Sequence, residues 1–509
     1  MSVPVFDTPL PEWPRMPEPR AEEWDPALEP ALVPAPGLDA IVARLRAPGA
    51  LAVTTGQQAG LFTGPAYTVT KALSARGLAL TLERRWGRPV VPVFWVPADD
   101  HDFDEVASVS WLAADGALVT ASLPPRAPDA PLAPLGLELL GEPVRALLQS
   151  FESSFPDQGT SGETVAWLRR HYRPDATIAG AFAGAMAELL APFGIACLNA
   201  GHAVVKRKTA PLVLRALERA ADLDRALIAR AAELSAAGRD AGVVVGDHAS
   251  LVFLLGDLGR DRLILDGNGF VARRARVGVT LPELGRIAAE EPDRLSGNVL
   301  LRPVLESALL PTVAYVAGPG ELRYLALASP VYQQLAVPQQ RPLARWSGLF
   351  VEPRVTRVLA KYGAPVEELL HDPSAFESRI AREALPAGTE GAFAALRGAI
   401  ERGYEPVLRA VTAVDPTLER TGASARGQAL HGAQELEKKL LQHARKRSAT
   451  ELAQVARARL AVLPEGKPQE RVLTMAGYLA RYGTGILAPL AEHIAAWYAH
   501  ALEAGPPRP

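Results

Sequence analysis

A glycine-spaced stretch near the N-terminal third of the chain can hold an anionic group. In TTGQQAGLFTGPAYTVTK, residues 54–71, glycines stand at positions 56, 60 and 64 between an expected strand and an expected helix. Such a junction presents unpaired backbone N–H groups and the positive end of a helix dipole, which suit a phosphate or a carboxylate. The spacing matches neither a Walker loop nor the dinucleotide-binding GxGxxG pattern. We expect ligand contacts from Gln57, Gln58, Thr63, Gly64, Tyr67 and Lys71.

A second stretch, WVPADDHDFDEV at residues 95–106, crowds carboxylates around one histidine. Carboxylates this close cannot all ionise without a compensating charge. A substrate ammonium group is one natural partner and a divalent cation is the rival. We favour the organic ligand and assign no metal, because no second His/Asp cluster is visible in the sequence. Histidine can exchange a proton near neutral pH, so we expect catalysis by His101, Asp100 and Asp102, with Trp95 and Asp99 binding substrate.

A third stretch, residues 296–326, ends an apolar strand and opens a helix at Gly318-Pro319-Gly320-Glu321. This corner is a second junction that can accept an anion or an amine. Arg302, earlier in the same stretch, can clamp a carboxylate with two parallel hydrogen bonds, although a surface salt bridge would explain it nearly as well. We therefore add Arg302, Gly318, Gly320 and Glu321 to the expected substrate-binding residues.

The pattern of strands and helices that must position these residues predicts an α/β fold. Apolar runs at 50–55, 90–96 and 310–316 predict buried parallel strands, and 194–199 a further one. A helix is predicted from Pro65 to Arg76, with Gly77 as its stop. A β-hairpin is predicted over 249–273. We expect an extended N-terminal arm over 1–49, a Rossmann-like parallel-sheet core from 50–120 and 290–350, and an inserted mixed α/β region over 121–289.

The C-terminal third, from residue 351 to 509, is predicted to be a helical domain. No proline stands between Pro416 and Pro464, which would allow one unbroken helix over 416–463. Its small apolar seam runs in steps of four and three, as in a coiled coil, through Leu418, Gly422, Ala425, Ala429, Gly432 and Leu436. The glycines lower helix stability, so a partner helix must support the segment, either within the chain or in a homodimer.

Composition excludes several classes of protein. The 509 residues are 48% hydrophobic and 22% charged, typical of a globular chain, and the net charge of −2 provides no basic field for nucleic acid. One cysteine, Cys197, excludes a disulfide framework. No run of 18 apolar residues and no signal peptide is visible. We expect a cytoplasmic protein that binds neither nucleic acid nor membrane.

Taken together, the stretches TGQQAGLFTGPAYTVTK, VPVFWVPADDHDFDEV, SGNVLLRPV with LLPTVAYVAGPGELRYL, and the late PQERVL with YLARYG resemble the bacillithiol-biosynthesis cysteine-adding enzyme family (BshC). The resemblance covers about residues 50 to 490. It implies a Rossmann-type core with connecting insertions and a helical coiled-coil domain. It also implies a ligase that joins L-cysteine to glucosaminyl-malate, giving bacillithiol.

The energy donor for that reaction is not visible in the sequence. No cofactor is assigned, but a free carboxylate needs activation before it forms an amide, so ATP or another activating nucleotide is expected. Two other classes stay open: a metal-dependent hydrolase that uses the Asp99–Asp104 cluster, and a non-enzymatic nucleotide-binding scaffold built around the long helix.

Overall fold

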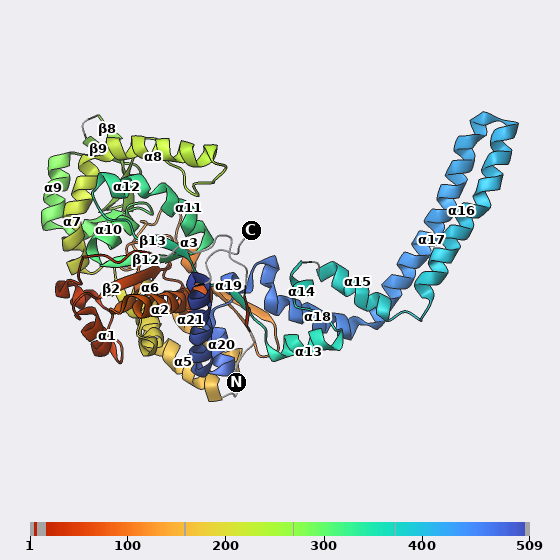
Figure 1. Cartoon of the computed structure of the whole chain (residues 1–509), viewed down its shortest axis with the longest axis horizontal. Coiled ribbons are helices and arrows are strands. Elements are labelled where there is room, and N and C mark those ends of the chain that lie inside the picture. Colours follow the sequence, from red (N-terminus) through yellow and green to blue (C-terminus); the bar gives the residue numbers. More distant parts are fainter. Residues whose placement is uncertain (1–4, 8–16, 157–158, 268, 372, 504–509) are drawn as a thin grey trace. The chain divides into compact units, whose positions relative to one another are not determined.

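The chain divides into two compact units. The computed structural model in Figure 1 describes residues 5–7, 17–156, 159–267, 269–371 and 373–503. The first unit comprises residues 1–350 together with 469–509, and the second comprises 351–468. The final helices, α19 (Gln469–Val472), α20 (Met475–Tyr482) and α21 (Leu487–Glu503), are thus part of the first unit. The sequence predicted a helical domain that continues to residue 509, whereas the second unit of the structure ends at residue 468.

A parallel sheet forms the centre of the first unit. Its strands lie in the order β13–β12–β2–β3–β6, and each neighbouring pair is parallel. Every residue of β2, β3 and β12 is buried, as expected for strands covered on both faces. The predicted Rossmann-like core is confirmed. The strand bounds are β2 Leu51–Gly56, β3 Val90–Val96, β6 Ala196–Asn199, β12 Thr312–Ala317 and β13 Arg341–Ala344.

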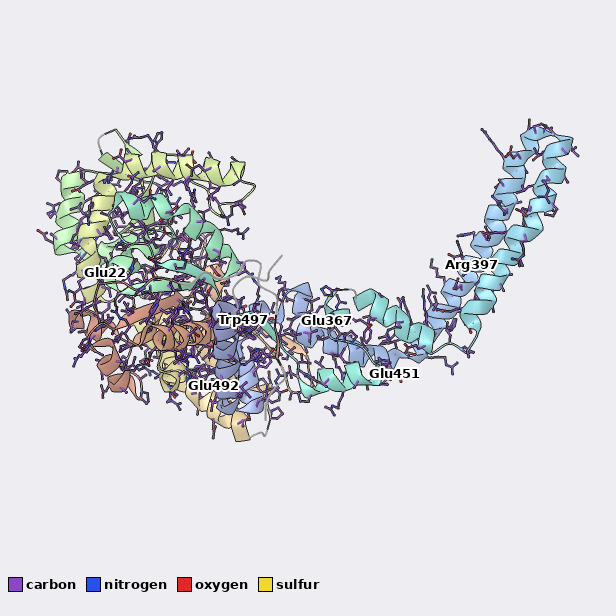
Figure 2. The ribbon with its side chains drawn as sticks, in the orientation of Figure 1. Glu22, Glu367, Arg397, Glu451, Glu492 and Trp497 are labelled. Carbon is purple, nitrogen blue, oxygen red and sulfur yellow. The ribbon has the colours of Figure 1, made fainter. Side chains whose placement is uncertain are left out.

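Helix α2 (Tyr67–Trp86) is longer than predicted, because Gly77 does not end it. Gly77 faces α21, and a Cβ atom at this position would lie 3.1 Å from the Cα of Ala495. The glycine therefore allows two helix backbones to approach closely. Figure 2 labels Glu492 on α21, whose carboxylate accepts a hydrogen bond from Arg76 of α2 at 2.9 Å. The sequence pattern could not distinguish this packing role from a helix stop.

Replacing Gly77 with leucine should destabilise the protein, although leucine is the better helix former. Overpacking a close contact costs about 1–3 kcal/mol. Gly285, in helix α9 (Leu281–Glu290), is the matched control, because nothing lies within 4 Å of a Cβ there. Gly285→Leu should be neutral or stabilising by up to about 1 kcal/mol. Thermal unfolding of both variants measures the contrast, and equal shifts in melting temperature would contradict the packing role of Gly77.

An antiparallel sheet lies between β6 and β12 in the sequence and includes the predicted hairpin. Its strand order is β10–β9–β8–β7–β11, and Figure 1 shows helices α7 to α10 beside it. It has its own apolar core, which includes Leu217, Val252 and Leu284. The bounds are α7 Ala203–Glu218, α8 Ala220–Ala236, β7 Ala249–Gly256, β8 Gly259–Asp266, β9 Gly269–Ala272, β10 Gly278–Val279, β11 Leu295–Gly297 and α10 Arg302–Leu309.

The N-terminal segment is folded onto the core where the structure describes it. The 3₁₀ helix η1 (Pro26–Ala31) and helix α1 (Leu38–Leu45) bury Leu28 and Ile41 in one cluster with Val93. The prediction of an extended arm over 1–49 is therefore wrong for this part, because its apolar residues cover the parallel sheet. Residues 1–4 and 8–16 lie outside the described residues, and β1 (Val5–Asp7) pairs with β14 (Gly348–Phe350).

The other elements of the first unit connect the two sheets or cover them. Six of them follow β3 in the chain, and two follow β12. Their bounds are α3 Phe103–Val106, β4 Ser108–Leu112, β5 Leu118–Ser122, α4 Pro143–Ser153, α5 Gly159–His171, α6 Ile178–Leu190, α11 Pro319–Leu327 and α12 Ser329–Gln334. Within the described residues, no helix combines the length and the apolar character needed to cross a membrane.

The second unit contains a long antiparallel helical hairpin of α16 (Thr389–Val414) and α17 (Glu419–Arg447) (Figure 1). The predicted helical domain is confirmed, and its long helix pairs within the chain. The unbroken helix over 416–463 is wrong, because the backbone leaves helical geometry at Ser448, with ψ at 20°. The remaining helices of the unit are α13 Pro353–Lys361, α14 Glu367–His371, α15 Pro373–Glu383 and α18 Ala449–Val462.

The residues of α17 that face α16 match the predicted apolar seam near Gly422. Towards Leu436, the buried positions are shifted by one residue from the predicted ones. A Cβ on Gly422 would lie 2.5 Å from the Leu408 side chain of α16, so glycine permits the close approach there. Further along, Leu436 is 57% exposed, whereas Ala433 is buried. Glu437 accepts a hydrogen bond at 2.6 Å from Arg397, which Figure 2 labels on α16.

Candidate active site

The three sequence stretches meet at one cavity of about 580 Å³ in the first unit. It lies at the edge where β2, β3 and β12 end, which is where parallel sheets commonly bind ligands. The cavity is also lined by the antiparallel sheet, through Phe253 and Arg260, and by Arg471 of α19. The sequence-predicted residues that line it are Gln57, Gln58, Tyr67, Trp95, Asp99, Asp100, His101, Arg302, Gly318, Gly320 and Glu321.

The glycine-spaced turn does not offer its N–H groups to a ligand as expected. The backbone N–H of Thr63 donates to the hydroxyl of Tyr172 at 2.8 Å, and that of Gly64 donates to the Leu61 carbonyl at 2.8 Å. At the start of α2, the N–H of Ala66 donates to the Leu473 carbonyl at 2.7 Å. Thr63 and Gly64 are absent from the cavity lining. The assignment of Thr63 and Gly64 to substrate is corrected, because acceptors elsewhere in the protein and in the turn itself already engage these donors.

Lys71 also lies beneath the cavity wall rather than in it. Its side chain is 1% exposed, and its ammonium forms an ion pair with Glu321. The same ammonium donates to the Gly56 carbonyl at 2.6 Å and lies 3.4 Å from the Gln57 amide oxygen. Burial lowers the pKa of Lys71, and the carboxylate of Glu321 opposes that shift. Lys71 therefore joins the ends of β2 and β12 instead of contacting substrate.

Glu321 lines the cavity, but its carboxylate is already engaged. Besides Lys71, it accepts hydrogen bonds from the Gly318 N–H at 2.6 Å and from the Tyr315 hydroxyl at 2.8 Å. Burial would raise the pKa of Glu321, but the Lys71 charge and the Gly318 hydrogen bond hold it below its usual value. Glu321 thereby fixes the first turn of α11.

Asp102, one of the expected catalytic residues, caps helix α3. Its carboxylate accepts a hydrogen bond from the Glu105 N–H at 3.3 Å, and the residue is exposed outside the cavity lining. A local capping role explains its position after the strand. The expectation that Asp102 acts with His101 is corrected on this placement.

Two cations that the sequence analysis missed pair with the first two carboxylates of the acidic loop, those of Asp99 and Asp100. Lys206 of α7 donates to Asp99 at 2.8 Å and to the Leu295 carbonyl at 2.8 Å. Arg260 of β8 lies 3.6 Å from Asp100. Both side chains are less than 10% exposed. The compensating charges come from the inserted region.

Asp100 is the most connected residue of this loop. It accepts hydrogen bonds from the Gln58 amide at 2.6 Å and from the His101 N–H at 2.7 Å. Burial alone would raise the pKa of Asp100, but the charge of Arg260 and the Gln58 hydrogen bond hold it below its ordinary value. Asp100 is therefore a carboxylate at neutral pH, and it ties β2 to the end of β3.

His101 is an unusually weak base in this setting. Burial and the nearby charge of Arg260 lower its pKa, and the carboxylates of Asp100 and Asp102 oppose the shift only in part. Tyr67, on another wall of the cavity, stays neutral because burial raises its pKa to about 12. Glu105 also lines the cavity and is exposed, and partial desolvation by the surrounding protein together with the charge of Asp102 raises its pKa.

Arg302 lies against a buried carboxyl group. Its guanidinium is 3.3 Å from Glu306 and donates to the Tyr324 hydroxyl at 3.2 Å. Glu306 is fully buried, and burial raises its pKa from 4.5 to about 7, against the opposing charge of Arg302. Glu306 can therefore retain its proton in the folded protein at a pH where it would lose it in the unfolded chain.

Replacing Glu306 with glutamine should remove a pH dependence of stability. A carboxyl group with a raised folded pKa binds more protons in the folded state, so its contribution to stability is lost as pH rises from 4.5 towards 7. Between pH 5 and 8, the free energy of unfolding of the wild type should fall by about 2 kcal/mol relative to Glu306→Gln. Urea denaturation of both proteins at the two pH values measures this difference. Parallel pH profiles would contradict it.

The acidic loop does not form a metal site within the part of the chain that the structure describes. No group of three or more His, Cys, Asp and Glu side chains is arranged there to hold an ion. Asp99 and Asp100 are instead paired with Lys206 and Arg260.

Comparisons with known proteins agree with this architecture. The sequence model described as "Bacillithiol biosynthesis BshC, N-terminal Rossmann-like domain" matches residues 36–342, and that of the BshC C-terminal coiled-coil domain matches 348–497. A protein of Heliobacterium modesticaldum is 31% identical over 89% of this chain and 83% of its own length. Proteins of Salinibacter ruber and Solibacter usitatus are 32% and 33% identical, over 87% and 89% of this chain and 80% and 84% of their own lengths. All three relatives carry the name "Putative cysteine ligase BshC".

Proposed function

The chain belongs to the bacillithiol-biosynthesis BshC family, and from this premise we propose that it joins the carboxyl group of L-cysteine to the amine of glucosaminyl-malate. The reaction forms one carbon–nitrogen bond and makes bacillithiol. A free carboxylate and an amine do not condense on their own, so the proposal includes ATP or another nucleotide as the activating co-substrate.

One observation supports the proposal most strongly: three segments far apart in the sequence converge on one cavity. Gln58, Asp100 and Gly318 follow three different strands of the parallel sheet, and all of them line it. Asp100 and Gln58 are hydrogen-bonded to each other across the first two strand ends. A cavity of about 580 Å³ lies within the range of small-molecule sites.

The charges of the cavity suit an anionic substrate. Arg262 and Arg471 line it, and neither forms an ion pair within the described part of the chain. Arg302 adds a third guanidinium, shared with Glu306. The two carboxylates of the malyl group are the proposed partners of these cations.

The proposed proton acceptor is a carboxylate. The attacking amine must lose a proton as the amide forms, and a base with a raised pKa is better matched to that task. Glu105 meets this condition and lines the cavity. Asp100, ionised and fixed by Gln58, is the proposed contact for the ammonium group of cysteine.

The test is an assay of the purified protein with L-cysteine, glucosaminyl-malate and a panel of nucleoside triphosphates, read by mass spectrometry. The expected result is a product with the mass of bacillithiol and consumption of one nucleotide. The control lacks cysteine. Absence of product with every nucleotide, from a protein that is folded by circular dichroism, would refute the proposal.

We further propose that the protein is a homodimer through the helical hairpin. Val407, Val414 and Leu436 leave large apolar side chains exposed on α16 and α17, by 49%, 82% and 57%. Light scattering should give twice the chain mass of 54.2 kDa. Val407→Glu combined with Leu436→Glu should return it to the monomer.

A further inference from the structure

Arg260 contacts His101 in a way that restricts where the histidine can carry its proton. One guanidinium nitrogen of Arg260 lies 3.1 Å from Nδ1 of His101. Arginine has only donors and keeps its charge in proteins. In this contact, Nδ1 must therefore be the acceptor, which leaves the proton of the neutral ring on Nε2.

The rest of Arg260 is held by contacts that leave it little freedom. Its Nε donates to the Ser296 hydroxyl at 2.9 Å, and its second terminal nitrogen donates to the Gly297 carbonyl at 2.7 Å. The guanidinium lies 4.1 Å from the centre of the Phe253 ring, and the His101 ring packs against the same phenylalanine. Groups of β7 and β11 thus hold Arg260 of β8 next to the histidine, and the carboxylate of Asp100 lies 3.6 Å from the same guanidinium.

The charged groups around His101 favour the neutral ring. The charges of Arg260 on β8 and of Arg126 in the loop after β5 lower the pKa of His101. The charges of Asp100 and Asp102, on the same loop as the histidine, raise it. Arg126 donates to the backbone carbonyl of His101 at 2.8 Å. No hydrogen bond to Nε2 is found within the described part of the chain, and the His101 side chain lines the cavity.

We propose that Arg260 is a positioning residue that holds His101 as the neutral tautomer with its proton on Nε2, so that His101 meets substrate as a hydrogen-bond donor. The role at substrate rests on the proposed function, whereas the tautomer does not. In the ligase reaction, the donor would stabilise the carbonyl oxygen of the nucleotide-activated cysteine carboxyl group while the amine attacks. The carbon–nitrogen bond forms as the carbon–oxygen bond to the activating phosphoryl group breaks, and that phosphoryl group leaves with the bonding electrons. The proton of the amine then goes to a carboxylate and not to His101.

The experiment is nitrogen-15 NMR of the full chain with labelled histidine, with the His101 signals assigned by their loss in His101→Gln. The wild type should show an unprotonated Nδ1 and a protonated Nε2 at neutral pH. In Arg260→Gln, the signals should move toward a mixture of tautomers, and the ring should gain a proton at higher pH than in the wild type. Arg260→Lys should act in the same direction, because one ammonium cannot hold Ser296, Gly297 and His101 together.

Arg274→Gln is the matched control. Arg274 is an exposed arginine of the same inserted region, and its side chain donates to the Leu258 carbonyl at 2.8 Å, away from the cavity. This variant should keep the wild-type His101 spectrum and turnover. Both Arg260 variants should lower kcat by about tenfold or more.

The outcomes separate the two proposals. A proton on Nδ1 in the wild type overturns the positioning role even if Arg260→Gln fails to fold. An unchanged His101 spectrum in the Arg260 variants that fold also overturns it. The expected tautomer with no product under any nucleotide refutes the ligase and the role at substrate, while the assignment of the tautomer stands.

Discussion

Lys71→Met should lower the free energy of unfolding by about 3–5 kcal/mol, the cost of leaving a buried charge without its partner. The ammonium of Lys71 is buried and bonded to Glu321 and to the carbonyl of Gly56. Methionine fills similar space but donates nothing, so the carboxylate of Glu321 remains in the interior without its strongest partner. Urea denaturation at pH 7 measures the loss.

A second substitution shows whether the lost ion pair is the cause. Lys71→Met combined with Glu321→Gln removes both charges and should recover part of the stability, because coupled residues are not additive. Lys208→Met is the control, since Lys208 pairs with Asp25 at the surface. Exposed pairs contribute about 0–1 kcal/mol. A double variant that is no more stable than Lys71→Met alone would show that the damage comes from packing.

Asp100→Asn should lower the rate of the proposed ligase reaction by about a hundredfold or more while the protein stays folded. The carboxylate of Asp100 accepts from Gln58 and lies 3.6 Å from Arg260. Asparagine keeps the shape but loses the charge that balances Arg260, and an NH2 donor replaces one of the two acceptor oxygens. The ammonium of cysteine would then lose its proposed contact.

Asp102→Asn is the control variant for Asp100→Asn. Asp102 stands two residues away, outside the cavity lining, and caps a helix through the Glu105 N–H. Asparagine is an equally good cap, so this variant should lose far less activity than Asp100→Asn, although it removes the Asp102 charge that helps to raise the pKa of Glu105. Equal losses in the two variants would favour the original prediction that both aspartates act with His101.

The sequence predicted the cavity where ligand groups follow directly from strand ends. Gln58 and Asp100 come just after β2 and β3, and neighbouring parallel strands place such residues at one edge. The same logic failed at Thr63, because its N–H donates to the hydroxyl of Tyr172, which lies far away in the sequence. No local pattern separates a turn that binds a ligand from one whose donors are engaged by a distant part of the protein.

The two cations that pair with Asp99 and Asp100 were beyond sequence reasoning for a different reason. Lys206 and Arg260 belong to the inserted region, and their distances to Asp99 and Asp100 depend on how one sheet packs against the other. One signal was present: the predicted hairpin carries Arg260 and Arg262 at alternate positions, hence on one face of a strand. Two arginines on one face of a strand that is otherwise partly buried indicate a binding site. They do not show which carboxylates of the protein they pair with.

The discontinuous first unit has a consequence for the newly made chain. Residues 469–509 are synthesised after the second unit, yet α21 packs along α2 at Gly77. While the ribosome is still translating the second unit, the apolar flank of α2 has no cover, and the helical hairpin can pair before the catalytic unit is closed. Chaperone binding during translation should therefore concentrate on α2 and end when the final helix emerges.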